Sequence, residues 1–187
     1  MRYLTLLFIA CALAAQPLNG QVRVEELRTE YLREPLGIDN PAPRLTWIVS
    51  SDRAFRQSKA LVRVASRPEA LGRPDVWSAE STGAGNTATY EGAPLKPHTR
   101  YWWNVTVWDE RGRKATSQPA WFETGKRAPE DWAGQWISDA FTQEFRKAPM
   151  LRTEFGVEKE IVSARAYVCG VGYYELFING QRVGDRL

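Results

Sequence analysis

The residues that could carry chemistry in this chain are few, and their spacing fits no catalytic or metal-binding motif. The single histidine, His98, has no serine, cysteine or aspartate motif around it that would make it a catalytic base. The two cysteines, Cys11 and Cys169, lie far apart and lack the paired spacing of a zinc site. Among the acids, Glu175 lies in the densest stretch of motifs and is the best candidate for acid–base work. We therefore predict no catalytic residue, no metal ligand and no cofactor site in this chain.

Glu175 also has a structural interpretation, which we favour. It belongs to "YYELFI" (173–178), which is followed by Asn179-Gly180, the dipeptide most typical of a tight hairpin turn. Glu175 could anchor a turn or pair with Arg182 across the hairpin, and the cross-strand pair is the expected role. Asp185 is predicted to be a turn residue rather than an acid of a catalytic pair.

The first 20 residues are predicted to be an export signal. Arg2 precedes 13 mostly apolar residues (3–15), which is shorter than the about 20 residues that span a bilayer. "ALA" at 12–14 is a suitable cleavage site, and cleavage near Gly20 is an alternative. Another alternative is lipidation of Cys11, because residues 8–11 loosely resemble a lipoprotein box. The expected location is therefore secreted, periplasmic or at the cell surface, with no membrane span.

Charge and cysteine content exclude several classes of function. Without the signal the chain has 24 basic and 22 acidic residues, a net charge of +2, and the two signs are interspersed. A nucleic-acid-binding protein would show a basic stripe, so no nucleic-acid partner is expected. Cys169 then has no disulfide partner, and its apolar surroundings predict a buried, inert thiol.

Period-two alternation of apolar residues dominates the chain after the signal, and no long helix is predicted. A Gly-rich turn is expected over 81–87. Short strands at regular spacing predict an all-β antiparallel sandwich of the immunoglobulin class. The expected strands cover 22–27, 44–50, 60–66, 75–80, 99–110 and 117–125.

A tyrosine just before the strongest strand sharpens this prediction. In "LKPHTRY" (95–101), Tyr101 has the position of the tyrosine corner of immunoglobulin-like sandwiches, and the spacing resembles a fibronectin type III domain. The same alternation places Tyr101, Trp103, Val105 and Val107 in the core and Trp102, Asn104, Thr106 and Trp108 on the outer face. Trp102 and Trp108 are therefore candidates for a contact with a neighbouring domain, which we favour, or with a sugar.

The part of the chain after the sandwich begins with a polar, Trp-rich segment over 126–136. Its Trp132 and Trp136 are expected to dock onto a flanking domain. Strand-like patterns then recur over 149–157 and 162–172. Tyr173 and Tyr174 of the hairpin that follows are predicted mainly as packing residues, with a sugar or domain contact as the alternative.

Several motifs in order resemble the leading region of bacterial α-L-rhamnosidases of glycoside hydrolase family 78. "GVGYYELFINGQRVGD" (170–185) is similar to the start of the N-terminal β-sandwich of that family. The upstream segments "GIDNPAPRLTW" (37–47), "YWWNVTVWDERG" (101–112) and "WAGQWI" (132–137) are similar as well. The matching residues of the longest motif are Gly172, Tyr174, Glu175, Ile178, Asn179, Gly180, Arg182, Val183, Gly184 and Asp185.

The resemblance implies a domain order. It consists of a signal peptide (1–20), a fibronectin type III-like sandwich (22–125), the linker (126–136) and an incomplete, jelly-roll-like second sandwich (137–187). The family's inverting hydrolysis of terminal α-L-rhamnose uses two carboxylates in an (α/α) barrel, and no position here corresponds to them.

The resemblance also implies what the chain does and does not do. It is expected to be an inactive accessory region whose partners are the missing catalytic domain and, through the parent enzyme, rhamnose-containing glycans. The alternatives are a stand-alone carbohydrate-binding or adhesion module and a purely structural cell-surface protein.

Overall fold

The computed structural model describes residues 22–184, apart from residues 53, 140–147 and 163. The expected signal segment, with Cys11, and Asp185 lie outside the described residues. The chain divides into two compact units, Met1–Gly134 and Gln135–Leu187. Within the described part, no helix has the length and apolarity needed to cross a membrane.

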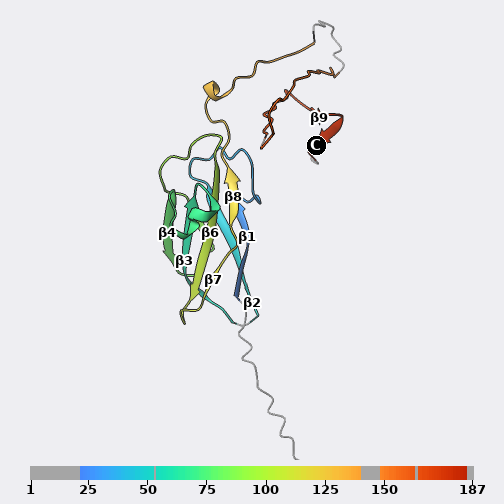
Figure 1. The fold of residues 1–187 in the computed structure, drawn as a ribbon. Helices are drawn as coiled ribbons and strands as arrows, with labels where there is room; N and C mark the ends of the chain where they lie inside the picture. Colours follow the sequence, from blue (N-terminus) through green and yellow to red (C-terminus); the bar gives the residue numbers. More distant parts are fainter. Residues whose placement is uncertain (1–21, 53, 140–147, 163, 185–187) are drawn as a thin grey trace, which may run out of the picture. The chain divides into compact units, whose positions relative to one another are not determined.

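Unit 1 is a sandwich of two antiparallel sheets, as predicted (Figure 1). The smaller sheet has the order β1-β2-β5, with β1 (Val22–Thr29), β2 (Arg44–Ser51) and β5 (Thr87–Thr89). The larger sheet has the order β4-β3-β6, and β7 and β8 both pair with β6. Its strands are β3 (Gln57–Ala65), β4 (Trp77–Thr82), β6 (Arg100–Asp109), β7 (Lys114–Thr116) and β8 (Ala120–Glu123). The helical segments of the described chain are two short 3₁₀ turns, η1 (Pro68–Gly72) and η2 (Pro129–Asp131).

The edge of the larger sheet differs from the prediction, because the strand expected over 117–125 is shortened to β8 (Ala120–Glu123) and a further strand, β7 (Lys114–Thr116), precedes it. Pro119 lies between them and has no N–H to donate to the ladder. Ser117 bridges the break: its backbone N–H donates to the carbonyl of Val105 at 2.9 Å, and its hydroxyl accepts from the N–H of Val105 at 3.1 Å. The short β5 is a further difference, since its first residue, Thr87, was expected to belong to a turn.

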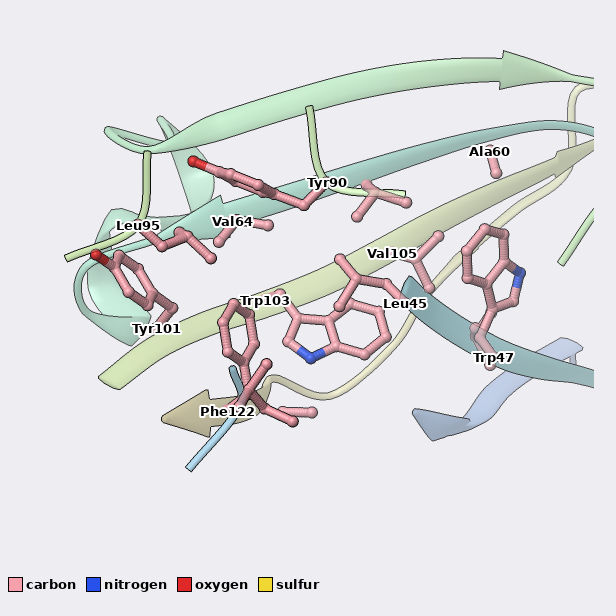
Figure 2. Close-up of a cluster of buried hydrophobic side chains, with 14 of the residues drawn as sticks. Leu45, Trp47, Ala60, Val64, Tyr90, Leu95, Tyr101, Trp103, Val105 and Phe122 are labelled. Carbon is pink, nitrogen blue, oxygen red and sulfur yellow. The ribbon is translucent and has the colours of Figure 1, made fainter. Parts of the chain in front are cut away.

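The core between the sheets follows the predicted alternation (Figure 2). Leu45 and Trp47 of β2 are buried, and they face the inward side chains of β6. Those β6 side chains are the four that alternation placed in the core: Tyr101, Trp103, Val105 and Val107. Thr106 is also buried although it was expected on the outer face, because its hydroxyl lies under neighbouring polar side chains of that face.

The tyrosine corner is present as predicted. The hydroxyl of Tyr101 accepts a hydrogen bond from the backbone N–H of Lys96 at 2.8 Å, and the Tyr101 ring stacks on Phe122 with 5.6 Å between centroids. The hydroxyl of Thr124 donates to the carbonyl of Lys96 at 2.6 Å. The loop before β6 is therefore fastened to both β6 and the end of β8.

The first part of the expected linker is hydrogen-bonded to the sandwich. The Asp131 carboxylate accepts from the backbone N–H groups of Arg127 at 3.0 Å and Ala128 at 3.1 Å, and Arg127 Nη1 donates to the carbonyl of Leu95 at 3.1 Å. The two tryptophans that were expected to dock onto a flanking domain are 44% (Trp132) and 74% (Trp136) exposed. Trp132 contacts the Lys126 amine, which lies 5.0 Å from the ring centroid.

Unit 2 contains the predicted hairpin. β9 (Leu176–Ile178) pairs with β10 (Gln181–Val183), and the two turn residues, Asn179 and Gly180, have φ values of 50° and 78°. These left-handed values are those of a type I′ turn, which Asn-Gly adopts at low cost. Arg182 Nη2 lies 3.4 Å from Glu175 Oε1, so the expected ion pair across the hairpin is confirmed.

The rest of unit 2 differs from the prediction. No strand occurs among the described residues of 149–157 and 162–172, where two were expected. Cys169 is exposed rather than buried. A strand needs a neighbour for its N–H and C=O groups, and the only pairing in the described part of this unit is β9 with β10. Without a paired strand there is no second layer to cover Cys169.

Candidate functional site

The described residues contain no cluster of side chains that could bind a catalytic metal ion. No group of three or more His, Cys, Asp or Glu in the described ranges could hold a metal ion. His98 lies in the turn before β6 with φ of 50°, and its backbone N–H donates to the carbonyl of Gly125 at 3.4 Å. The functional candidates are therefore surfaces: the outer face of the larger sheet, the hairpin tyrosines, and a turn after β1.

The outer face of the larger sheet holds both tryptophans that the sequence singled out. Trp102 and Trp108 are half-buried on β6. The Lys59 amine lies 5.0 Å from the ring centroid of Trp108 and 2.8 Å from Glu80 Oε2. Trp102 lies opposite Trp121 of β8, a tryptophan that the sequence analysis did not select. A third ring therefore joins this face.

Basic side chains of the same sheet cover these rings. The Arg100 guanidinium lies 3.9 Å from the ring centroid of Trp121 and pairs with Glu123 at 3.2 Å. Between the tryptophans, Arg63 Nη1 donates to the Thr106 hydroxyl at 2.9 Å, which lies 2.9 Å from the hydroxyl of Thr116. A cation over an aromatic face is itself a favourable contact. The rings of Trp108 and Trp121 are thus already covered by basic side chains, so this side of the sheet is poorly suited to stacking against a sugar.

The two tyrosines singled out in unit 2 lie on the hairpin region. Tyr173 is 72% exposed, and its hydroxyl donates to Glu175 Oε1 at 3.1 Å. Desolvation, together with this contact with Glu175, raises the pKa of Tyr173 above its ordinary value. Tyr174 is half exposed and packs so closely on Gly170 that a Cβ there would lie 2.6 Å from its ring. Both rings are accessible to a partner, while the network around Glu175 is structural.

A two-residue turn after β1 was missed by the sequence analysis. Thr29 and Leu32 exchange two backbone hydrogen bonds of 2.9 and 3.0 Å. The residues between them, Glu30 and Tyr31, have φ values of 48° and 66°. This is the conformation of a type I′ turn, which normally selects Asn-Gly because both central residues are left-handed. A glutamate and a tyrosine hold it here at a conformational cost of about 1–3 kcal/mol for each such residue.

Side chains from three segments hold this turn in place. Glu30 Oε1 accepts from the backbone N–H of Arg44 at 2.6 Å and from Asn40 Nδ2 at 3.2 Å. Arg28 Nη1 donates to the carbonyl of Tyr31 at 3.2 Å. The Arg44 guanidinium lies 4.9 Å from the centroid of the Tyr31 ring. The turn is therefore rigidly positioned despite its unfavourable backbone.

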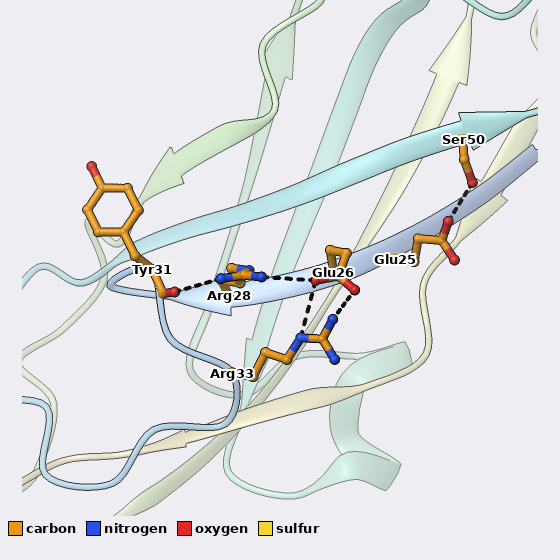
Figure 3. Close-up of polar contacts among 6 residues, drawn as sticks. All are labelled: Glu25, Glu26, Arg28, Tyr31, Arg33 and Ser50. Carbon is orange, nitrogen blue, oxygen red and sulfur yellow. Dashed lines mark hydrogen bonds and ion pairs between the residues drawn. The ribbon is translucent and has the colours of Figure 1, made fainter. Parts of the chain in front are cut away.

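An ion-pair cluster supports the turn from β1 (Figure 3). Glu26 has φ of 54° and lies in the irregular part of β1, where the register with β2 shifts. Its carboxylate pairs with Arg28 at 3.2 Å and with Arg33, whose Nε donates at 3.2 Å. These contacts, first with Arg33 and then with Arg28, lower the pKa of Glu26.

The turn exposes apolar side chains next to these charges. Tyr31, Leu32 and Leu36 are 59%, 48% and 51% exposed. We call residues 30–36 the turn surface. The available signal in the sequence was the Glu-Tyr pair after an alternating strand, but such a pair is not a recognised hairpin dipeptide. The dense charges of "EELRTEYLRE" (25–34) also obscured the apolar residues among them.

The facing sheets and the tyrosine corner define an immunoglobulin-like sandwich. Comparison with known proteins gives the family. Residues 24–128 match the model of the Rha78A-like, N-terminal immunoglobulin domain, and the chain belongs to this family. Residues 159–187 match the α-L-rhamnosidase N-terminal domain.

The similar proteins are much longer than this chain. An α-L-rhamnosidase of Streptomyces avermitilis is 42% identical over 63% of the chain, which covers 12% of that protein. One of Formosa agariphila is 29% identical over the whole chain, which covers 23% of it.

Solved structures agree with these similarities. The Streptomyces avermitilis α-L-rhamnosidase complexed with L-rhamnose gives a TM-score of 0.60 at 42% identity, covering 63% of this chain and 12% of that one. The α-L-rhamnosidase from Dictyoglumus thermophilum gives 0.58 at 29% identity, covering 62% of this chain and 14% of that one. The chain thus spans less than a quarter of the length of each of these relatives.

Proposed function

We propose that this chain is the non-catalytic N-terminal region of an exported α-L-rhamnosidase, an enzyme that releases terminal α-L-rhamnose from glycans or glycosides. The observation that carries the proposal is the order of two matches along one chain. The immunoglobulin domain of such enzymes matches residues 24–128, and their N-terminal domain matches residues 159–187. Two matches in that order are far more specific than either alone.

The chemistry of the reaction supports a non-catalytic role for this chain. Inverting glycoside hydrolysis needs an acid and a base on opposite sides of the bond, with carboxyl groups about 6.5–9.5 Å apart and room for water. The best acid candidate, Glu175, is held by Arg182 and by the Tyr173 hydroxyl on an exposed hairpin. A carboxylate engaged in this way is a structural group, so the catalytic pair belongs to the rest of the enzyme.

Export is the second part of the proposal. The apolar segment at residues 3–15 after Arg2 supports a cleaved signal peptide, and Cys11 offers a lipid anchor as the alternative. Expression of the chain with residues 1–20, followed by cell fractionation and mass spectrometry, tests both. A mature form that starts near residue 15 or 21 supports cleavage. A lipid-modified N-terminal cysteine at position 11 supports the anchor, and an uncleaved cytosolic product contradicts export.

A stand-alone carbohydrate-binding module is the alternative function, and it has less support. It is motivated by two sandwich patterns and many tryptophans, but on the outer face Lys59 lies over the ring of Trp108, and Arg100 lies over the ring of Trp121, which is opposite Trp102. Isothermal titration of the 187-residue protein with rhamnose and with rhamnose-containing oligosaccharides decides between them. Saturable heat favours the binding module, and its absence favours the accessory region.

Sequencing of the coding DNA through and beyond codon 187 tests the main proposal. A frame that continues into a helical barrel domain supports it, and a confirmed stop with no barrel sequence downstream contradicts it. The continued protein should hydrolyse an aryl α-L-rhamnoside, whereas the 187-residue chain should not. Turnover by the short chain alone would show that the catalytic groups had been assigned to the wrong part.

A further inference from the structure

The turn surface of unit 1 has the properties of a preorganised contact site. Glu30 and Tyr31 are both left-handed, and Glu26 and Glu34 nearby also have positive φ, at 54° and 44°. Non-glycine residues adopt this conformation rarely and only when surrounding contacts impose it. Here the contacts from Arg28, Asn40 and Arg44 impose it, and the result is an outward-pointing ring in a fixed position. A rigid exposed aromatic loses little entropy on binding.

The exposed side chains of this surface are those that protein contacts favour. Tyr31, Leu32 and Leu36 supply apolar area. Arg44 lies over the Tyr31 ring, but Tyr31 remains 59% exposed, unlike the half-buried tryptophans of the larger sheet. Tyrosine and arginine are enriched in the centres of protein interfaces, where they carry much of the binding energy. Ile48 of β2, which lies opposite Glu25 and outside the turn surface, is also exposed and provides a reference.

The charges around the surface indicate the chemistry of its partner. The Glu26 carboxylate is engaged by Arg28 and Arg33, and the Glu30 carboxylate by Asn40 and the Arg44 backbone. The side chains of Arg28 and Arg33 nevertheless remain 45% and 64% exposed. The Glu26 and Glu30 carboxylates are therefore paired within the turn, while the guanidinium groups of Arg28 and Arg33 remain partly exposed, with the exposed Glu34 beside them. A complementary partner has an apolar centre and carboxylates at its rim.

We propose that the turn surface docks onto another part of the same longer polypeptide, at an apolar patch rimmed by acidic side chains. This inference rests on the proposed function. This chain matches 12–23% of the length of its relatives, which extend far beyond the matched stretch. Most of the surface that could contact the turn surface therefore belongs to the rest of the same polypeptide. A second copy of this chain fits less well, because a two-fold contact would bring the exposed arginines of both copies together.

Hydroxyl-radical footprinting of the full-length enzyme and of the 187-residue chain tests the inference directly, because it measures the exposure of individual side chains. Tyr31, Leu32 and Leu36 should be labelled several-fold less in the full-length enzyme, while Ile48 should be labelled equally in both. Equal labelling of the turn surface in both proteins overturns the inference. Protection that appears in the short chain as its concentration rises also overturns it, because a second copy would then be the occupant.

A variant distinguishes docking from folding. Asparagine tolerates a left-handed backbone, so Tyr31→Asn should leave the short chain folded and as stable as the original. In the full-length enzyme the same change should restore labelling of Leu32 and Leu36, whereas Ile48→Thr should not. The aryl rhamnoside assay on the same samples separates the two proposals. Activity without protection refutes only the docking site, and protection without activity refutes only the rhamnosidase assignment.

Discussion

The Tyr101 hydroxyl and the Lys96 backbone N–H are joined by a hydrogen bond of 2.8 Å that closes one end of the sandwich. The Lys96 carbonyl accepts from the Thr124 hydroxyl at 2.6 Å, so both polar groups of one loop residue are tied to neighbouring strand ends. The Tyr101 ring is buried against Phe122. The corner therefore couples loop position to core packing, and it can be perturbed by removing a single oxygen.

Tyr101→Phe should destabilise unit 1 by about 1–3 kcal/mol, since it leaves the Lys96 N–H without its partner while the ring still fills the core. Urea unfolding followed by tryptophan fluorescence measures this loss. Tyr173→Phe, which removes an exposed hydroxyl of unit 2, should leave the same transition unchanged. An unchanged midpoint for Tyr101→Phe would mean that water replaces the hydroxyl at no cost.

Leu45→Ala should cost about 2–5 kcal/mol, because this side chain is fully buried between the sheets and its removal leaves a cavity. Thermal unfolding provides the measurement. Ile48→Thr on the same strand points outward and keeps a β-branched residue, so its effect should stay within about 0.5 kcal/mol. Similar losses for the two variants would contradict the inward and outward assignment of β2.

Acid should weaken unit 1 partly through Asp109. Burial raises the pKa of this carboxyl, but hydrogen bonds from the Arg113 side chain and from the N–H groups of Arg113 and Arg111 outweigh burial, and the pKa lies below its ordinary 3.8. A lowered folded-state pKa adds stability above the unfolded value, about 3.9. That stability declines below about pH 5 and is lost as pH falls through the folded pKa.

Asp109→Asn should therefore lower the stability at pH 7 and flatten its decline with acid, because the pairing with Arg113 is gone at every pH. Urea midpoints measured between pH 7 and pH 3 show both effects. Glu110→Gln, whose side chain is mostly exposed, provides the control and should leave the pH profile unchanged. A variant as acid-sensitive as the original protein would rule out Asp109 as a contributor.

The Lys59 amine should be energetically coupled to the Trp108 ring. A double-mutant cycle with Lys59→Met and Trp108→Leu should give about 0.5–1 kcal/mol of coupling, the usual value for an exposed cation over an indole. Lys114 lies opposite Trp108 on β7, so the cycle with Lys114→Met controls for charge alone. Zero coupling for Lys59 would leave the Trp108 ring available and would revive the sugar-platform interpretation.

Limited proteolysis should leave unit 1 as a resistant fragment. The described residues of 149–175 form no helix or strand, and Arg152, Lys159 and Arg165 among them are exposed to trypsin. Cleavage there should come first and leave a fragment that starts near residue 22 and ends between residues 125 and 134, identified by mass spectrometry. If no fragment near these limits survives, unit 1 does not fold independently.

The sequence predicted those features of the fold whose cause is local. The alternation in β6, the position of Tyr101 and the Asn179-Gly180 turn each depend on side-chain period or on one backbone preference. The ion pair between Glu175 and Arg182 was also predicted from that hairpin. Arg182 lies opposite Phe177, and Glu175, two residues before Phe177, reaches Arg182 diagonally.

The features that the sequence did not reveal depend on distant partners. The Glu30-Tyr31 turn is held by Asn40 and Arg44, which lie ten or more residues away, so its own dipeptide gave no signal. The outward tryptophans were expected to contact a second domain. The spacing of residues along the chain does not show which side chains of adjacent strands, such as Lys59, lie over their rings. The apolar run around Cys169 alternates like a strand, but alternation does not supply the strand that would pair with it.

The interrupted edge of the larger sheet has a consequence for how molecules of this protein meet one another. A long flat edge strand is a template on which another chain can add a strand and start a fibre. Here the edge consists of three residues in β7 and four in β8, separated by Pro119, and the Ser117 hydroxyl occupies the N–H of Val105 at the gap. An incoming strand finds no continuous row of free backbone groups along this edge. The sandwich can therefore be concentrated with little tendency to polymerise there.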